Sequence, residues 1–351
     1  MEHDVRIIHM GCLCVGIGIV LDKIRNFSEY ESWLIGQEAV ARKCDDKKAI
    51  SSDIKYYIEC AFLEAIADAG LNVEKLRQDE HIGVVIGSSL GFIDQIGYGQ
   101  DCLMDFSWFS KRIRLKGPLY ITSNTCTSSL NAVSIAQNLL ENGKLDYCIV
   151  GGVDVAGDFI LNGFESMNLL TSNTHINLQD KAHSGTILSS AIVFLVFKRG
   201  SDISKYNVEI ATSVVANEAF DLARIEHTGE TLQKAIQECF VRTSVSSEQI
   251  DILFTCANGI RAMDLQQKYL IENRFNSKIC TVSSVKIVVG HTLGASTLLD
   301  IISAIVFVKN GKVLKQDGEW VEKQAKYILI LSIGFVGAVG AVLLRNNMEK
   351  R

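Results

Sequence analysis

Cys126 is the residue of this sequence best placed for covalent chemistry, because it lies where a short apolar run ends and a helical pattern begins. Downstream of it, apolar residues recur at helical spacing, at Leu130, Val133, Ala136 and Leu140. A helix start offers unpaired N–H groups and the positive end of the helix dipole, and both favour a thiolate over a thiol. We therefore expect a sulfur nucleophile here. The alternative is a cysteine that only fills the core.

His291 stands in a second copy of this layout. Residues 290–295 lead into another apolar-periodic helix, and both helices end in an Asn-Gly pair, Asn142-Gly143 or Asn310-Gly311. Such a pair favours the left-handed turn that stops a helix. Two matching units predict a duplicated α/β fold in which the two helix starts meet at one site. We expect one half over residues 1–204 and the other over 205–351.

Composition narrows the class of protein. The chain has 351 residues, 48% of them hydrophobic, and this predicts a large core. It has a single proline, which argues against a flexible linker. A net charge of −5 without a basic block argues against binding to nucleic acid. No stretch predicts a cofactor.

The ten cysteines are expected to be reduced, in a cytoplasmic protein. Glu2, His3 and Asp4 stand where a signal peptide would have basic residues, so we expect neither secretion nor a disulfide framework. The sequence contains no Cys-x-x-Cys pair, which leaves a metal site without support.

Residues 327–344 imitate a membrane span, because they carry no charge over 18 positions. Three glycines interrupt them, however, and we expect two buried strands, over 328–331 and 341–344, rather than a membrane helix. Other strands are expected over 5–15, 82–87, 191–197 and 208–215, and residues 51–53 are expected to cap a helix. A strand over 251–255 would deliver Asn258 to a loop.

Taken together, these patterns resemble the β-ketoacyl synthases of the thiolase-like superfamily, from about residue 5 to residue 344. The matching motifs are the nucleophile run at 124–129, the turn ending at Asp154, the piece at 163–171, the run from Lys286 through Gly290-His291 to Gly294-Ala295, and the terminal turn at 334–337. The resemblance implies the thiolase-like fold, with duplicated α/β halves in α-β-α-β-α layers.

The resemblance also implies a chemistry. In that family the cysteine takes an acyl group from an acyl carrier protein, malonyl carrier protein loses CO2, and the carbanion attacks the thioester. Two imidazoles stabilise the enolate. This assigns the nucleophile to Cys126, one imidazole to His291 and a supporting cation to Lys286. Phe335, between Gly334 and Gly337, matches the residue that covers the pocket and swings when the cysteine is acylated.

Several family residues are replaced. Asn258 stands in place of the other histidine, although an amide can still donate a hydrogen bond and the related thiolases have Asn in a comparable place. The acidic pair that follows is reduced to Asp264 and Gln267. If Gln267 occupies the position of the family's carboxylate, Lys286 loses its acidic partner.

A chain that keeps the motifs of the fold but replaces several site residues resembles the chain-length factors of type II polyketide systems. We expect such a β subunit, which shapes the acyl-chain pocket in a heterodimer with a ketosynthase α subunit and meets an acyl carrier protein. The apolar strand at Tyr120 would form the subunit contact. The alternative is an active β-ketoacyl-[acyl carrier protein] synthase that uses Cys126, Asn258 and His291. A thiolase comes last, since it would need a second cysteine in the terminal turn.

Overall fold

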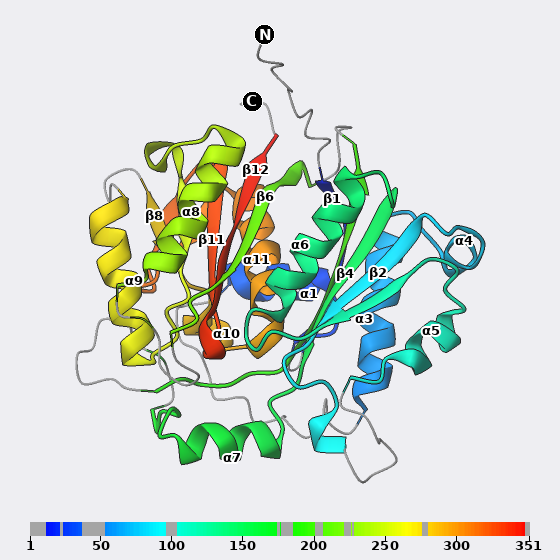
Figure 1. Ribbon diagram of the computed structural model, residues 1–351, viewed down its shortest axis with the longest axis horizontal. Helices are drawn as coiled ribbons and strands as arrows, with labels where there is room; N and C mark the ends of the chain where they lie inside the picture. Colours follow the sequence, from blue (N-terminus) through cyan, green and yellow to red (C-terminus); the bar gives the residue numbers. More distant parts are fainter. Residues whose placement is uncertain are drawn as a thin grey trace.

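The computed structural model describes residues 12–21, 24–36, 53–95, 104–173, 176, 185–200, 206–220, 226, 228–275 and 280–347. Figure 1 shows the two halves side by side, with the earlier part of the chain in blue to green and the later part in yellow to red. Expectations for residues 1–11 and 51–52, and for the 204/205 boundary, fall outside the described residues.

One ten-stranded sheet runs through both halves, in the order β3-β2-β4-β5-β1-β6-β12-β11-β7-β8. From one edge to the centre, the strands of the first half stand in the order β3-β2-β4-β5-β1. From the other edge, the strands of the second half stand in the order β8-β7-β11-β12-β6, which is the same order when the sheet strands of each half are counted along the chain. The two halves therefore repeat one topology. The strands are β1 (Cys12–Leu21), β2 (Ile82–Gly87), β3 (Leu119–Thr122), β4 (Tyr147–Asp154), β5 (Ala191–Arg199), β6 (Val208–Asn217), β7 (Ile252–Phe254), β8 (Thr281–Ser283), β11 (Tyr327–Ile333) and β12 (Ala338–Asn346). β9 (Lys312–Leu314) and β10 (Trp320–Glu322) form a separate pair. The duplicated α/β fold expected from the sequence is confirmed.

Helices cover the sheet in layers. Two of them, α6 (Ser128–Glu141) and α11 (Ser296–Asn310), contact each other at the centre of the molecule (Figure 1). α3 (Ile54–Asp68) packs on β1 and β5, and α8 (Glu230–Thr243) packs on β6 and β12. The other helices are α1 (Phe27–Ile35), α4 (Val73–Gln78), α5 (Ser107–Ile113), α7 (Asp158–Ser166), α9 (Arg261–Arg274) and α10 (Lys286–Val289).

Both central helices end as their Asn-Gly pairs predict. The helical turn after α6 is closed by Gly143 at φ +66°, and α11 is closed by Gly311 at φ +63°. The start expected for the second helix is wrong. Residues 290–295 are not its first turn, because α10 and a short 3₁₀ turn at Leu293–Ala295 precede the first residue of α11, Ser296.

Two other expectations need correction. The strand expected over 5–15 lies partly outside the described residues, and the part that is described, Cys12–Leu21, continues beyond residue 15 to Leu21. Asp53 precedes α3 without capping it through its side chain.

The uncharged stretch at 327–344 is the antiparallel pair β11 and β12, as expected. Within the described residues, one helical stretch is long and apolar enough for a membrane, Leu293–Asn310, and 89% of it is buried inside the protein, as in a core helix.

α3 contacts β1 where the two halves of the sheet meet. Among the described residues, β1 pairs with β6 at Cys12 and Leu13 only. Farther along the strand, the N–H groups of Ile17 and Ile19 donate instead to carboxylates of α3, each at 3.0 Å. Gly18 permits this approach, because a Cβ there would lie 1.9 Å from a carbonyl oxygen of α3.

Candidate active site

Cys126 lies in a tight turn between β3 and α6. Thr125 adopts a left-handed conformation, with φ at +49°. Ser128 closes the turn, since its hydroxyl accepts the N–H of Asn124 at 2.9 Å and donates to the carbonyl of Thr125 at 2.6 Å. The turn holds the thiol at the start of the central helix, where the sequence predicted it.

The thiol of Cys126 contacts the imidazole of His291. The Sγ atom lies 3.2 Å from Nε2, and both residues are only 5% exposed. Backbone bonds fix the histidine, because its N–H donates to Ile187 at 2.7 Å and its carbonyl accepts from Ser189 at 2.9 Å. The two chemistry-bearing residues of the two halves are therefore brought together, as the duplicated pattern predicted.

Burial keeps both groups uncharged. Burial and, to a smaller extent, the charge of Asp154 together raise the pKa of the Cys126 thiol to about 12, although Lys286 opposes the rise. Burial and, to a smaller extent, the charge of Lys286 together lower the pKa of His291 to about 3. The expectation of a thiolate was wrong, because α6 begins two residues after Cys126 and desolvation outweighs the helix start.

Asp154 ties the surrounding turns together. Its carboxylate accepts from the hydroxyls of Ser88 and Ser89, at 3.0 and 2.8 Å, and from the N–H of Gly294 at 2.6 Å. Burial raises the pKa of this carboxyl to about 6, although the hydrogen bonds oppose the rise. The end of β4 is thereby joined to the loop that follows His291.

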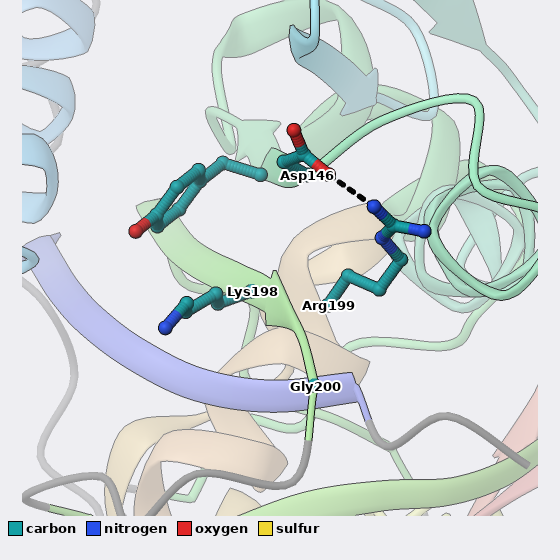
Figure 2. A pocket seen from close by; sticks show the side chains of 5 residues that line it. Asp146, Lys198, Arg199 and Gly200 are labelled. Carbon is teal, nitrogen blue, oxygen red and sulfur yellow. Dashed lines mark hydrogen bonds and ion pairs between the residues drawn. The ribbon is translucent and has the colours of Figure 1, made fainter.

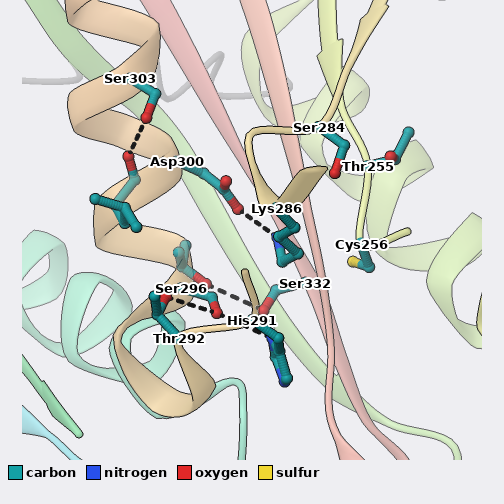
Figure 3. Close-up of polar contacts among 12 residues, drawn as sticks. Thr255, Cys256, Ser284, Lys286, His291, Thr292, Ser296, Asp300, Ser303 and Ser332 are labelled. Carbon is teal, nitrogen blue, oxygen red and sulfur yellow. Dashed lines mark hydrogen bonds and ion pairs between the residues drawn. The ribbon is translucent and has the colours of Figure 1, made fainter. Parts of the chain in front are cut away.

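Lys286 keeps an acidic partner, contrary to the expectation based on Gln267. Its Nζ lies 3.0 Å from Oδ2 of Asp300, and both side chains are buried (Figure 3). Gln267 has another role, since its Oε1 accepts the N–H of Cys256 at 3.3 Å. Asp300 was missed, but a lone charged residue in the otherwise uncharged helical segment 296–308 is a signal that could have found it.

Asn258 follows β7 and is buried, but it makes local contacts. Its Oδ1 accepts the N–H of Ile260 at 3.1 Å, and its own N–H donates to Asp264 at 3.0 Å. Burial raises the pKa of Asp264 to about 6. Among the described residues, no hydrogen bond joins Asn258 to Cys126 or His291.

The terminal turn lies against the turn that holds Cys126. Thr125 donates its hydroxyl proton to the carbonyl of Phe335 at 3.1 Å. A Cβ on Gly334 would lie 2.3 Å from that hydroxyl, so the contact requires glycine. The ring of Phe335 meets Phe164 edge-on, at 5.9 Å between centroids. Val336 adopts φ +66°, a left-handed conformation that a β-branched residue rarely takes.

A surface pocket of about 550 Å³ lies elsewhere (Figure 2). Asp146, Tyr147, Lys198, Arg199 and Gly200 line it. It opens at the beginning of β4, whereas Asp154 at the end of that strand adjoins the candidate site. The eight residues of β4 put roughly 20 Å between the two.

Comparison with known proteins identifies the family. The sequence model of the β-ketoacyl synthase N-terminal domain matches residues 107–203, and that of the C-terminal domain matches residues 208–317. The chain belongs to the β-ketoacyl synthase family. It is 23% identical, over 77% of its length and 72% of the relative's, to 3-oxoacyl-[acyl-carrier-protein] synthase 2 of Staphylococcus aureus.

Solved structures share the fold. One is a ketosynthase in complex with its chain length factor from Xenorhabdus doucetiae; 99% of this chain and 100% of that chain align, with a TM-score of 0.80 and 18% identity. Another is a type II polyketide acyl carrier protein in complex with its ketosynthase bound to a hexaketide; 96% and 99% align, with a TM-score of 0.80 and 16% identity. The expected thiolase-like architecture is confirmed.

Proposed function

We propose that this chain is an acyl-transferring β-ketoacyl synthase subunit of a type II polyketide or fatty-acid system, with Cys126 as its nucleophile. The contact between Sγ of Cys126 and Nε2 of His291, at 3.2 Å, carries the proposal. The buried ion pair of Lys286 and Asp300 supports the proposal. The charge of Lys286 acts on both Cys126 and His291, and Asp300 balances this charge and holds it in a fixed place. Of the two functions expected from the sequence, these contacts favour the alternative, an active synthase.

The loading step starts from a neutral thiol and a neutral imidazole. Sγ of Cys126 attacks the carbonyl carbon of a carrier-bound thioester while its proton passes to Nε2 of His291. The carbon–sulfur bond to the carrier breaks, and the same proton protonates the departing carrier sulfur. One thioester is exchanged for another, so the step requires no oxidant, metal or cofactor.

Condensation requires stabilisation of the malonyl enolate after loss of CO2. His291 would donate a hydrogen bond from Nε2 to the thioester oxygen. Asn258 would supply the second donor through Nδ2, because its Oδ1 is held by the N–H of Ile260. An amide in place of an imidazole can supply this second hydrogen bond, so we expect slow but measurable condensation.

The experiment incubates the protein with octanoyl-N-acetylcysteamine thioester and measures the intact mass. We expect one octanoyl adduct, which is absent in Cys126→Ala and forms about 100-fold more slowly in His291→Ala. Cys239→Ala is the matched control, because that buried cysteine lies on α8 and should leave the adduct unchanged. A wild-type protein that takes no acyl group under these conditions would refute the proposal.

The second candidate is the chain-length-factor role, and the replaced histidine favours it. With Asn258 held by local contacts, the enolate site lacks one of the family's two imidazoles. In that role the acyl group would be loaded on the cysteine of a ketosynthase partner. Cys126→Ala would then leave product formation by the complex almost unchanged, whereas the active-synthase proposal predicts its loss.

The edge of the sheet at β3 suggests where a partner subunit binds. β3 is an edge strand within the described sheet, and Tyr120 on it is 43% exposed. An exposed edge strand is a surface on which a second subunit can continue the sheet. A ketosynthase α subunit is the proposed occupant and an acyl carrier protein the proposed acyl donor, both in the cytoplasm. Tyr120→Glu should weaken co-purification with the partner without removing the acyl adduct on Cys126.

A further inference from the structure

Two hydroxyls lie behind the imidazole of His291, on the side away from the thiol. Oγ of Ser296 is 3.4 Å from Nδ1 of the ring, and Oγ1 of Thr292 is 3.2 Å from Oγ of Ser296. Figure 3 shows His291 and Thr292, which precede α11, beside Ser296, the first residue of that helix. All three residues are buried. Ser296 is the hydrogen-bond partner of Nδ1 among the residues that the structure describes.

A hydroxyl can either donate or accept a hydrogen bond, so this pair suits both neutral forms of the ring. When Nδ1 carries the proton, Oγ of Ser296 accepts a hydrogen bond from Nδ1–H and donates its own hydroxyl proton in a hydrogen bond to Thr292. When Nε2 carries the proton, Ser296 donates to Nδ1 and Thr292 donates to Ser296. A carbonyl or a carboxylate at this place would fix one tautomer only.

The proposed function, on which this inference rests, needs both forms in turn. During loading Nε2 must accept the thiol proton of Cys126. After loading the sulfur has no proton, and Nε2 must donate to a substrate oxygen. A ring that stays neutral can do both only by changing tautomer.

We propose that Ser296, supported by Thr292, is a positioning residue that holds His291 in either neutral tautomer as the state of Cys126 changes. No net proton is gained, because in each change of tautomer solvent water takes the proton from one ring nitrogen and supplies one to the other. The ring begins and ends each step with one proton, and the group that faces Nε2 decides which nitrogen holds it. The long distance from Ser296 to Nδ1 fits a contact that tightens with substrate bound.

The test reads the tautomer directly, by two-bond ¹⁵N–¹H correlation spectra of protein labelled with ¹⁵N-histidine. In the free-thiol protein we expect the proton of His291 on Nδ1. After alkylation of Cys126 with iodoacetamide, which places a carbonyl oxygen at the sulfur, we expect it on Nε2. In Ser296→Ala the change on alkylation should be lost, whereas Ser296→Thr keeps a hydroxyl and should retain it.

A rate measurement complements the spectra. Acyl loading of Cys126 should fall about tenfold in Ser296→Ala, as for the loss of one hydrogen bond. Thr297→Ala is the control, because this buried hydroxyl on the same helix bonds to Ser332, at 3.0 Å, instead of to His291. Should Ser296→Ala fold poorly, Thr292→Val gives a second variant, in which the tautomer change should be weakened.

Two outcomes would overturn the inference: a tautomer change that persists in Ser296→Ala, or a loss of loading rate that Thr297→Ala shows equally. Failure of the proposed function is distinguishable. It would appear as absence of the acyl adduct from the wild type, while the tautomer change on alkylation, which needs no turnover, would still support the role of Ser296.

Discussion

Lys286 and Asp300 form an ion pair inside the protein, with 3.0 Å between Nζ and Oδ2. Lys286 begins α10 and Asp300 lies in the second turn of α11, so the pair fixes the stretch between them, which contains His291. A buried cation without this partner would pay a large desolvation cost. The pair therefore positions the imidazole as well as balancing charge.

Removal of one partner should be far more damaging than removal of both. We expect Asp300→Asn to lower the free energy of unfolding by about 3–5 kcal/mol, because it leaves Lys286 buried and unpaired. The double variant Lys286→Met with Asp300→Leu should recover most of this loss. Urea unfolding of the wild type and the variants measures both. Equal losses in the single and double variants would contradict the ion-pair account.

The reactivity of Cys126 should follow a thiol whose pKa is about 12. In the native protein the rate of alkylation by iodoacetamide should rise about tenfold per pH unit from pH 7 to 10 without a plateau, since the thiolate fraction rises in proportion. His291 stays neutral in this range, so no inflection near pH 6.5 is expected. The urea-unfolded protein is the control and should level off near pH 9. A native plateau near neutral pH would reveal a thiolate–imidazolium pair instead.

The sequence predicted the site through patterns that act locally. Asn-Gly stops and apolar periodicity are set within a few residues, so the ends of α6 and α11 and the placement of Cys126 and His291 could be read from the chain. The duplicated topology followed because both halves carry the same order of elements.

What could not be predicted depends on three-dimensional burial or on residues distant in sequence. The thiol pKa of Cys126 is set by desolvation, which the helix-start argument does not contain. The partner of Lys286 lies fourteen positions downstream on another helix, whereas the family motif pointed to Gln267. The hydrogen bond from Ser296 likewise appears only when the 3₁₀ turn before α11 is known.

Gly18 should tolerate no side chain. A Cβ there would lie 1.9 Å from the carbonyl oxygen of Ala61 and 2.7 Å from the N atom of Ala65, both in the backbone of α3. We expect Gly18→Ala to destabilise the protein by about 3 kcal/mol, as α3 must move from β1. Gly163→Ala is the matched control. A Cβ at that position in α7 meets nothing within 4 Å, so this change should stabilise by about 0.5–1 kcal/mol. Similar thermal unfolding of both variants would contradict the close packing of α3 on β1.

Phe335 should control which reagents reach Cys126. It is held by the bond of its carbonyl to Thr125 and by its ring contact with Phe164, next to a thiol that is 5% exposed. Val336 adds stiffness, because a β-branched residue at φ +66° has few other conformations. In the wild type we therefore expect a long-chain electrophile to label Cys126 far more slowly than a small one does.

The measurement compares iodoacetamide with an iodoacetamide that carries a twelve-carbon chain, by intact mass over time. Phe335→Gly should accelerate labelling by the long reagent by about tenfold or more and change labelling by the small one much less, since only the long chain needs the ring to move. Val336→Gly should give a smaller acceleration in the same direction, because it frees the turn but keeps the ring. Phe240→Leu serves as the control, since this buried ring on α8 makes no contact with the turn among the aromatic pairs of the described residues. Fast and equal labelling of the wild type by both reagents would show that Phe335 does not close the site.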